Sequence, residues 1–176
     1  MAVQPPRSGF GGQRPPFSGG QSSSGQGFGG SKPQGSTAPP LKNLPTPRPV
    51  AYFRDGKLIP ELMDSEAERI ARELGQVSTT QLRRFYEDVL NLRQRLAAAV
   101  GRQDNAEEVF SRLRADFKML KAKAVYANGR SGKAFPRELL QFFIDHVEAV
   151  KNARDFEAFC KHFQAVVAFH KFYGKD

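Results

Sequence analysis

Residues 78–101 read STTQLRRFYEDVLNLRQRLAAAVG, and they carry the signals of one long amphipathic helix. The stretch opens with Ser78, and Gln81 follows three residues later, which is the spacing of an N-terminal capping box. It closes at Gly101, a residue type that often stands just past the last helical turn. Between these ends, apolar residues recur about every 3.6 positions and form a single stripe: Leu82, Phe85, Tyr86, Val89, Leu92, Leu96 and Val100. The stretch therefore predicts a helix that buries one face.

The flanking sequence predicts four more helices, and from Pro60 onward no alternating run indicates a strand. The first should cover about 64–74, with Asp64 or Ser65 as its N-terminal cap and Gly75 ending it. The third should cover about 105–128 and end at Asn128 and Gly129. The fourth should begin at Pro136, and the fifth should cover about 155–173 with Asp155 as its cap. Because the connections are short, neighbouring helices should run roughly antiparallel. The predicted fold class is all-α: a single compact bundle of about five helices with a Phe-rich core, over residues 51–176.

The last two predicted helices carry more apolar residues than one buried stripe requires. Phe142 lies beside the inner face of the fourth helix, and Val166 and Phe169 widen the face of the fifth. Two explanations are open. Either these helices are central and surrounded on several sides, which we favour, or they expose a patch for a partner.

Residues 1–50 differ in composition from the rest of the chain. They hold ten of the twelve prolines, ten of the sixteen glycines and no acidic residue. Such a stretch cannot bury enough apolar surface to offset the entropy cost of ordering it, so it predicts a disordered low-complexity tail. The tail is either simply solvated, or its Arg and Phe residues make weak, multivalent contacts with RNA or partners.

The end of this tail is a different kind of segment. From Ala38 to Val50 the prolines become dense, which favours an extended, polyproline-like backbone. The apolar residues in and just after it are candidates to dock the segment on the bundle: Leu41, Leu44, Val50, Tyr52 and Phe53.

The charge of the chain is unevenly divided. The whole sequence has 27 Lys and Arg against 18 Asp and Glu, for a net charge of +9. Five of the basic residues lie in 1–50, so the remaining 22 basic and 18 acidic residues leave the bundle with +4. No apolar run approaches the roughly 18–20 residues of a membrane span, and no apolar signal segment opens the chain, so we expect a cytoplasmic protein without a membrane partner.

Residue types that carry chemistry are sparse. Cys160 is the one cysteine, so an internal disulfide and a two-cysteine metal site are excluded, and a buried thiol is expected. His162 and His170 lie about 80° apart around one helix, which is not the i, i+4 spacing of a metal-binding helix. Catalysis by two histidines, His146 included, would need them to converge across the fold. We therefore expect no enzyme, no catalytic residue, no metal and no cofactor.

Basic residues are the more informative feature. On the helix over 105–128 they border both sides of the apolar face: Arg114, Lys118 and Lys121 on one side, and Arg112 and Lys123 on the other, with Arg130 and Lys133 following. Arg83 and Arg84 stand in the first turn of the helix over 78–100, where positive charge is mildly unfavourable for the helix dipole. Two interpretations are open: a solvated surface with Arg84 paired to Asp88 at i+4, or sequence-tolerant contact with phosphates.

Three strings, in this order, resemble the small subunit of the type III-A CRISPR–Cas (Csm) effector complex: STTQLRRFYEDV (78–89), MLKAKAVYANGR (119–130) and FQAVVAFHKFYG (163–174). The positions that match the family pattern are Thr80, Leu82, Arg83 and Tyr86 in the first string, Leu120, Lys121, Lys123, Tyr126 and Arg130 in the second, and Ala168, His170 and Lys171 in the third. Phe169 replaces the tyrosine that the family carries there. The resemblance covers about residues 57–174.

The resemblance implies a small, all-helical, non-catalytic subunit that stacks head to tail in several copies along the backbone subunits that carry the guide RNA. Its implied partners are guide RNA, target RNA, other subunits of the Csm complex and further copies of itself. The implied RNA-binding residues are Arg83, Lys121, Lys123 and Arg130, and the charge pattern adds Arg84, Lys118 and, more weakly, Arg114. We expect Tyr126 to pack or to hydrogen-bond rather than to stack on a base.

Two other functions remain as alternatives. One is a helical protein-interaction adaptor that makes no direct contact with RNA and whose charge serves only solubility. The other, more remote, is a metal-independent ribonuclease that uses His162 or His170.

Overall fold

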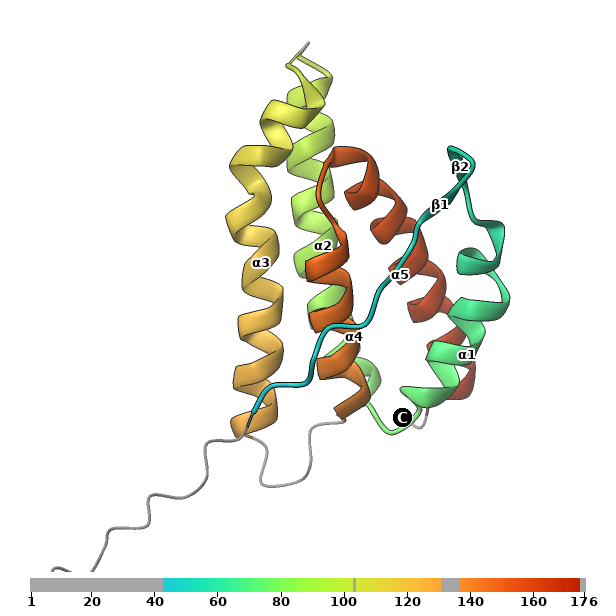
Figure 1. The fold of residues 1–176 in the computed structure, drawn as a ribbon. Helices are drawn as coiled ribbons and strands as arrows, with labels where there is room; N and C mark the ends of the chain where they lie inside the picture. Colours follow the sequence, from blue (N-terminus) through green and yellow to red (C-terminus); the bar gives the residue numbers. More distant parts are fainter. Residues whose placement is uncertain (1–42, 103, 131–136, 175–176) are drawn as a thin grey trace, which may run out of the picture. The chain divides into compact units, whose positions relative to one another are not determined.

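The computed structural model describes residues 43–102, 104–130 and 137–174. Its helices are α1 (Ser65–Glu73), α2 (Thr79–Val100), α3 (Ala106–Arg130), α4 (Arg137–Ala149) and α5 (Ala153–Tyr173), as Figure 1 shows. Before them stand a hairpin of β1 (Phe53–Arg54) and β2 (Lys57–Leu58) and the 3-10 turn η1 (Pro60–Met63). The all-α class and the five predicted helices are confirmed. The part of the predicted tail up to residue 42 lies outside the described residues.

Two predicted helix ends are wrong. Asn128 and Gly129 were expected to end the third helix, but α3 continues through both to Arg130. Neither residue takes the positive φ of a left-handed C-cap, so the glycine permits an end there without imposing one. At the start of α5 the cap is Asn152, whose Oδ1 accepts the Asp155 N–H at 2.8 Å, and the helix begins at Ala153. Asn and Asp cap helices about equally well, so the local sequence did not decide between them.

The start of α2 agrees with its prediction, since Ser78 Oγ accepts the Gln81 N–H at 3.2 Å. α2 and α3 form an antiparallel pair. Two ion pairs between them, Arg95 with Asp116 and Asp88 with Lys123, show how the two helices are aligned. α3 also packs on α4, and α5 contacts both α1 and α2 (Figure 1).

The core is built from phenylalanine, as predicted. The largest fully buried side chains include Phe110 and Phe117 of α3, Phe143 of α4, and Phe156, Phe159 and Phe163 of α5. Phe85 of α2 joins them, with its ring centroid 4.5 Å from that of Phe143. Phe142 and Val166 are buried and Phe169 is half-buried against the core, so the wide apolar faces belong to central helices and not to an exposed patch.

Residues 43–52 run as an extended segment across α4 (Figure 1). The backbone N–H and the Nε of Arg48 both donate to the Asp145 carboxylate, each at 2.8 Å, and the Gln141 side-chain amide donates to the Thr46 carbonyl at 3.0 Å. Asp145 is buried, so the segment supplies the partners that this carboxylate needs inside the bundle.

The apolar residues of this segment dock only in part as expected. Tyr52 is buried, and Val50 and Phe53 are half-buried against the core. Leu44 is half exposed, and Leu41 lies outside the described residues.

The hairpin was not predicted. Its turn is Asp55-Gly56, with φ of 49° and 72°, and Asp-Gly is a preferred pair for the tight turn that joins two strands. Arg154 of α5 donates to the Gly56 carbonyl, and its guanidinium carbon lies 4.0 Å from the centre of the Phe53 ring. α5 therefore anchors a hairpin that is too short to be stable alone.

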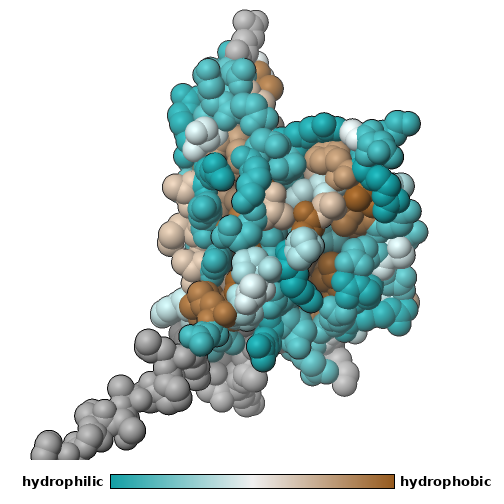
Figure 2. All heavy atoms as spheres, in the orientation of Figure 1, coloured by the Kyte–Doolittle hydropathy of each residue, from teal (hydrophilic) through white to brown (hydrophobic). Residues whose placement is uncertain are grey.

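The surface facing the reader in Figure 2 is mostly hydrophilic, with hydrophobic residues in small separate groups. Within the described residues, no helix combines the length and the apolar character needed to cross a membrane.

Candidate nucleic-acid interface

A groove of about 500 Å³ lies between the first turns of α2 and the last turns of α3, which the antiparallel pairing places side by side. Its lining consists of Gln81, Arg84, Phe85, Asp88, Lys123, Tyr126 and Ala127. Two of the predicted RNA-binding residues, Arg84 and Lys123, are thus brought together although they are about 40 positions apart in sequence.

The charges in this groove are not paired along one helix. One of the two open interpretations paired Asp88 with Arg84 at i+4, but Asp88 Oδ2 accepts from Lys123 Nζ of α3 at 2.8 Å. A contact between helices therefore replaces the local one. Arg84 is exposed and forms no ion pair with any residue that the structure describes.

The remaining predicted residues do not share one face. Arg83 is exposed and pairs with Glu87 at 3.2 Å. Lys121 points to α4, where its Nζ lies 3.6 Å from Glu148, whereas Lys123 points to α2. Two residues apart on a helix are about 200° apart around its axis, which is why the two lysines meet different neighbours. The sequence motif that joined them therefore spans two sides of α3.

Three further predicted cations are described less completely. Lys118 is exposed and has no ion pair within the described part of the chain. Arg130 is the last residue of α3, and its side chain lies outside the described residues. Arg114 is half-buried, and its Nε has no hydrogen-bond partner among the groups that the structure describes.

Tyr126 corrects another expectation. We predicted that it packs or hydrogen-bonds, but its side chain is 67% exposed at the rim of the groove. The exposure of Tyr126 could have been predicted from the helical spacing. Leu120 and Ala124 are on the buried face of α3, and a residue two positions after Ala124 points away from that face.

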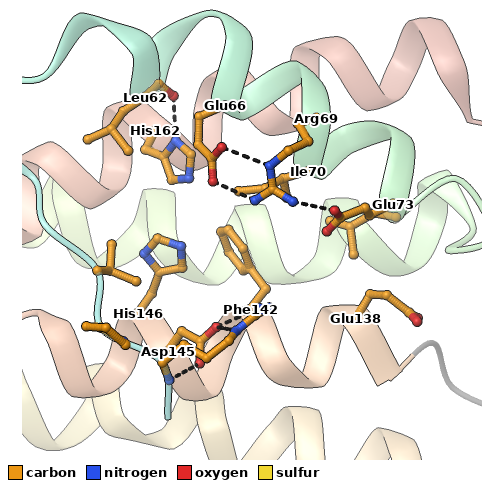
Figure 3. A pocket seen from close by; sticks show the side chains of 14 residues that line it. Leu62, Glu66, Arg69, Ile70, Glu73, Glu138, Phe142, Asp145, His146 and His162 are labelled. Atoms are coloured by element: carbon orange, nitrogen blue, oxygen red, sulfur yellow. Dashed lines mark hydrogen bonds and ion pairs between the residues drawn. The ribbon is translucent and has the colours of Figure 1, made fainter.

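A second cavity, of about 240 Å³, lies among α1, α4, α5 and the segment around Arg48 (Figure 3). It brings together His146 of α4 and His162 of α5, whose ring centroids are 5.1 Å apart. Sequence reasoning compared His162 with His170, but His170 bonds separately to the Leu74 carbonyl at 3.0 Å. The pair that converges is therefore one that spacing along a single helix could not identify.

Both histidines of the cavity are tied to the fold. His162 Nδ1 lies 2.5 Å from the Leu62 carbonyl, to which it donates, and His146 Nδ1 lies 2.7 Å from the Tyr52 hydroxyl. Burial lowers the pKa of each ring, that of His146 well below its ordinary value, so both are neutral at physiological pH. A neutral imidazole lacks the second proton of an imidazolium, so neither ring is in the form that acts as the acid of a catalytic histidine pair.

Most of the charged groups around the cavity are paired as well. Arg69 bonds to Glu66 and Glu73, as Figure 3 shows, and Arg48 bonds to Asp145. No Ser, Thr or Cys is among the described residues that line the cavity. Among the described residues, no group of three or more His, Cys, Asp or Glu side chains is placed to hold a metal ion. The arrangement is a packed polar network, and the α2–α3 groove is the better candidate for a functional site.

Comparison with protein families decides which class this chain falls in. The family model described as Csm2 Type III-A matches residues 57–176, more than half of the sequence. The chain belongs to the Csm2 type III-A family. It is therefore a structural subunit of the type III-A CRISPR Csm complex, and the resemblance found from the three sequence strings is confirmed. Comparisons with curated proteins and with solved structures found no match.

The Csm2 match covers β2, η1 and all five helices. It therefore includes both walls of the α2–α3 groove and the histidine cavity. Residues 1–56, with the Arg48 segment that docks on α4, lie outside the match.

Proposed function

We propose that this Csm2-family subunit contacts the guide or target RNA of its complex through cations on α2 and α3, and that it cleaves nothing itself. The observation that carries the proposal is the groove in which Arg84, without an ion-pair partner among the described residues, stands beside Lys123. Arg83 and Lys118 are further exposed cations on the same two helices, Lys121 lies on the α4 side of α3, and Arg130 is the last residue of that helix; we include all four in the proposed contact. Cations bind the phosphates and not the bases, so their contacts do not depend on the RNA sequence. This suits a subunit that must accept any guide sequence.

The existing ion pairs do not argue against phosphate binding. Arg83, Lys121 and Lys123 each have a carboxylate partner, but every side chain in these pairs is at least 31% exposed. Exposed ion pairs contribute only about 0–1 kcal/mol, so a phosphate can displace the carboxylate at little cost. Breaking each ion pair still costs some of the free energy gained by binding the phosphate. We therefore expect Arg84 and Lys118, which have no ion pair among the described residues, to contribute more to RNA binding.

In the complex, several copies of this subunit would stack head to tail in the cytoplasm. Head-to-tail contacts use two different patches on each copy, and such contacts do not close on themselves, which suits growth along a filament. Family membership supports a place in the Csm complex, and the stacking is part of our proposal.

The test is filter binding of the full-length chain to single-stranded RNA at several salt concentrations. The proposal requires log affinity to fall with log salt by about 0.7 per phosphate contacted. Arg84→Glu with Lys123→Glu should weaken binding at least tenfold at moderate salt, because two attractive charges become repulsive. Lys57→Glu with Lys161→Glu, the same reversal of two charges at exposed positions of β2 and α5, is the matched control. Binding without a salt slope, or equal loss in the control, would favour the protein-interaction adaptor.

A further inference from the structure

Tyr126 is an aromatic side chain that the fold does not use. The other aromatic residues of α3, Phe110 and Phe117, are at most 2% exposed, whereas Tyr126 is 67% exposed. No ring contact is recorded for Tyr126 within the described residues, although Tyr86 of α2 packs edge-on against Phe163 at 6.1 Å. One face of the Tyr126 ring is therefore free to receive a flat ligand.

The groove beside this ring has the size and lining of a binding site for one nucleotide. Its volume of about 500 Å³ is within the range of roughly 300–1,000 Å³ that is typical of small-ligand pockets. Phe85, 6% exposed, and Ala127 supply an apolar floor. The side-chain amide of Gln81 offers both a donor and an acceptor, which can meet the edge of any base.

The charges of the groove complement a phosphodiester. Arg84 and Lys123 contribute two positive charges against the one negative charge of Asp88, so the lining carries a net charge of +1. Asp88 is held by Lys123 at 2.8 Å, which leaves the Arg84 guanidinium as the cation available to an incoming phosphate. A ring for the base and a cation for the phosphate thus stand in one groove.

We propose that this groove holds one unpaired RNA nucleotide, with its base stacked on Tyr126 and its phosphates beside Arg84 and Lys123. The inference rests on the proposed RNA contact and specifies its ligand. In a paired A-form helix the base faces are covered by their neighbours, so only an unpaired base can present a face to Tyr126. Stacking on an aromatic ring tolerates every base, which keeps the contact independent of sequence.

The experiment uses the full-length chain and two RNA probes of one sequence, a single strand with 2-aminopurine at internal positions and its complete duplex. Tyr126→Leu removes the ring and keeps a good helix former, and Tyr126→Phe keeps the ring and removes the hydroxyl. Phe172→Leu is the control, since Phe172 is an 81% exposed aromatic residue on α5.

We expect Tyr126→Leu to weaken binding of the single strand by roughly tenfold, the order found when one stacked aromatic ring is removed. Tyr126→Phe and Phe172→Leu should bind within about twofold of the parent chain. The quenching of 2-aminopurine fluorescence on binding should fall only in Tyr126→Leu, and duplex binding should not change. Arg84→Gln should instead lower the salt slope by about 0.7, because it removes a phosphate contact and leaves the ring.

Four results would overturn the inference. The first is that Tyr126→Leu binds the single strand and quenches 2-aminopurine as the parent chain does, while Arg84→Gln still lowers the salt slope. The proposed phosphate contact would then be correct and the stacking on Tyr126 would be wrong. Equal losses in Tyr126→Leu and Tyr126→Phe would assign the effect to the hydroxyl. Equal losses for the single strand and the duplex would remove the preference for an unpaired base. If the parent chain binds neither probe, the proposed function fails together with the inference.

Discussion

The rings of His146 and His162 lie 5.1 Å apart, and both side chains are almost completely shielded from water. His162 donates from Nδ1 to the Leu62 carbonyl, so its Nε2 is an acceptor, and no hydrogen-bond partner for it exists among the described residues. A proton on either ring would create a buried charge next to the other ring, with Arg48 and Arg69 close by and Glu66 as the opposing carboxylate. The pair is therefore stable only when both rings are neutral.

The first prediction concerns pH. The folded-state pKa of each histidine is lower than its unfolded value, mainly because of burial, so below about pH 6.5 the unfolded chain binds more protons than the folded chain. The free energy of unfolding should therefore be highest above pH 6.5 and fall as the pH drops toward 5. Urea unfolding at pH 7.5, 6.0 and 5.0 measures this.

His146→Gln serves as the comparison for that pH series, because it removes one titrating ring and keeps a polar group beside Tyr52. Its stability should change less between pH 7.5 and 5.0 than that of the parent chain. The low pKa of Glu66 affects stability only at more acidic pH. If the free energy of unfolding of the parent chain stays constant or increases as the pH drops from 7.5 to 5.0, the two histidines do not form a neutral pair.

The second prediction concerns the extended segment. Asp145→Ala should lower the free energy of unfolding by about 1–3 kcal/mol, because it leaves the Arg48 N–H and the Gln141 amide without their buried acceptor. Arg48→Ala should cost less, since its side chain is 65% exposed and its backbone N–H keeps the bond. Urea unfolding of the two variants compares them directly, and a larger loss for Arg48→Ala would show that the guanidinium, and not the buried carboxylate, carries the contact.

The third prediction tests the corrected cap of α5. Asn152→Ala should cost about 1 kcal/mol, the usual loss when a capping side chain is removed, and Asn152→Asp should be nearly neutral. Thermal unfolding of both variants gives the difference. If Asn152→Ala melts with the parent chain, the cap contributes no stability.

The fourth prediction concerns Lys121, on the α4 side of α3, together with Arg130, the last residue of that helix. Lys121→Glu combined with Arg130→Glu should weaken RNA binding by several-fold while the far-ultraviolet circular dichroism spectrum stays that of the parent chain. The effect should be smaller than that of the Arg84 and Lys123 reversal, because Lys121 is already paired with Glu148 in the free subunit. Filter binding of both double variants at one salt concentration ranks them, and a stronger loss for the Lys121 variant would move the interface toward α4.

Local signals explain most of the helix prediction. The apolar stripe from Leu82 to Leu96 and the Ser78 cap lie within one segment, so periodicity and capping alone identify α2. The prediction was wrong where the local sequence allows two outcomes. Asn152 and Asp155 are both good capping residues for α5, and Gly129 permits the end of a helix but α3 continues past it. The Asp55-Gly56 turn was readable as a tight turn and was missed.

The sequence by itself determined the all-α class, the Phe-rich inner faces and the family, because each of these depends on residues that are close together along the chain. Only the tertiary structure decided which side chains meet. It paired Asp88 with Lys123 instead of Arg84, turned Lys121 toward α4, and brought His146 to His162. The physical reason is that such pairings depend on how separate helices are rotated and aligned against one another, which the packing of the whole core selects and no short segment encodes.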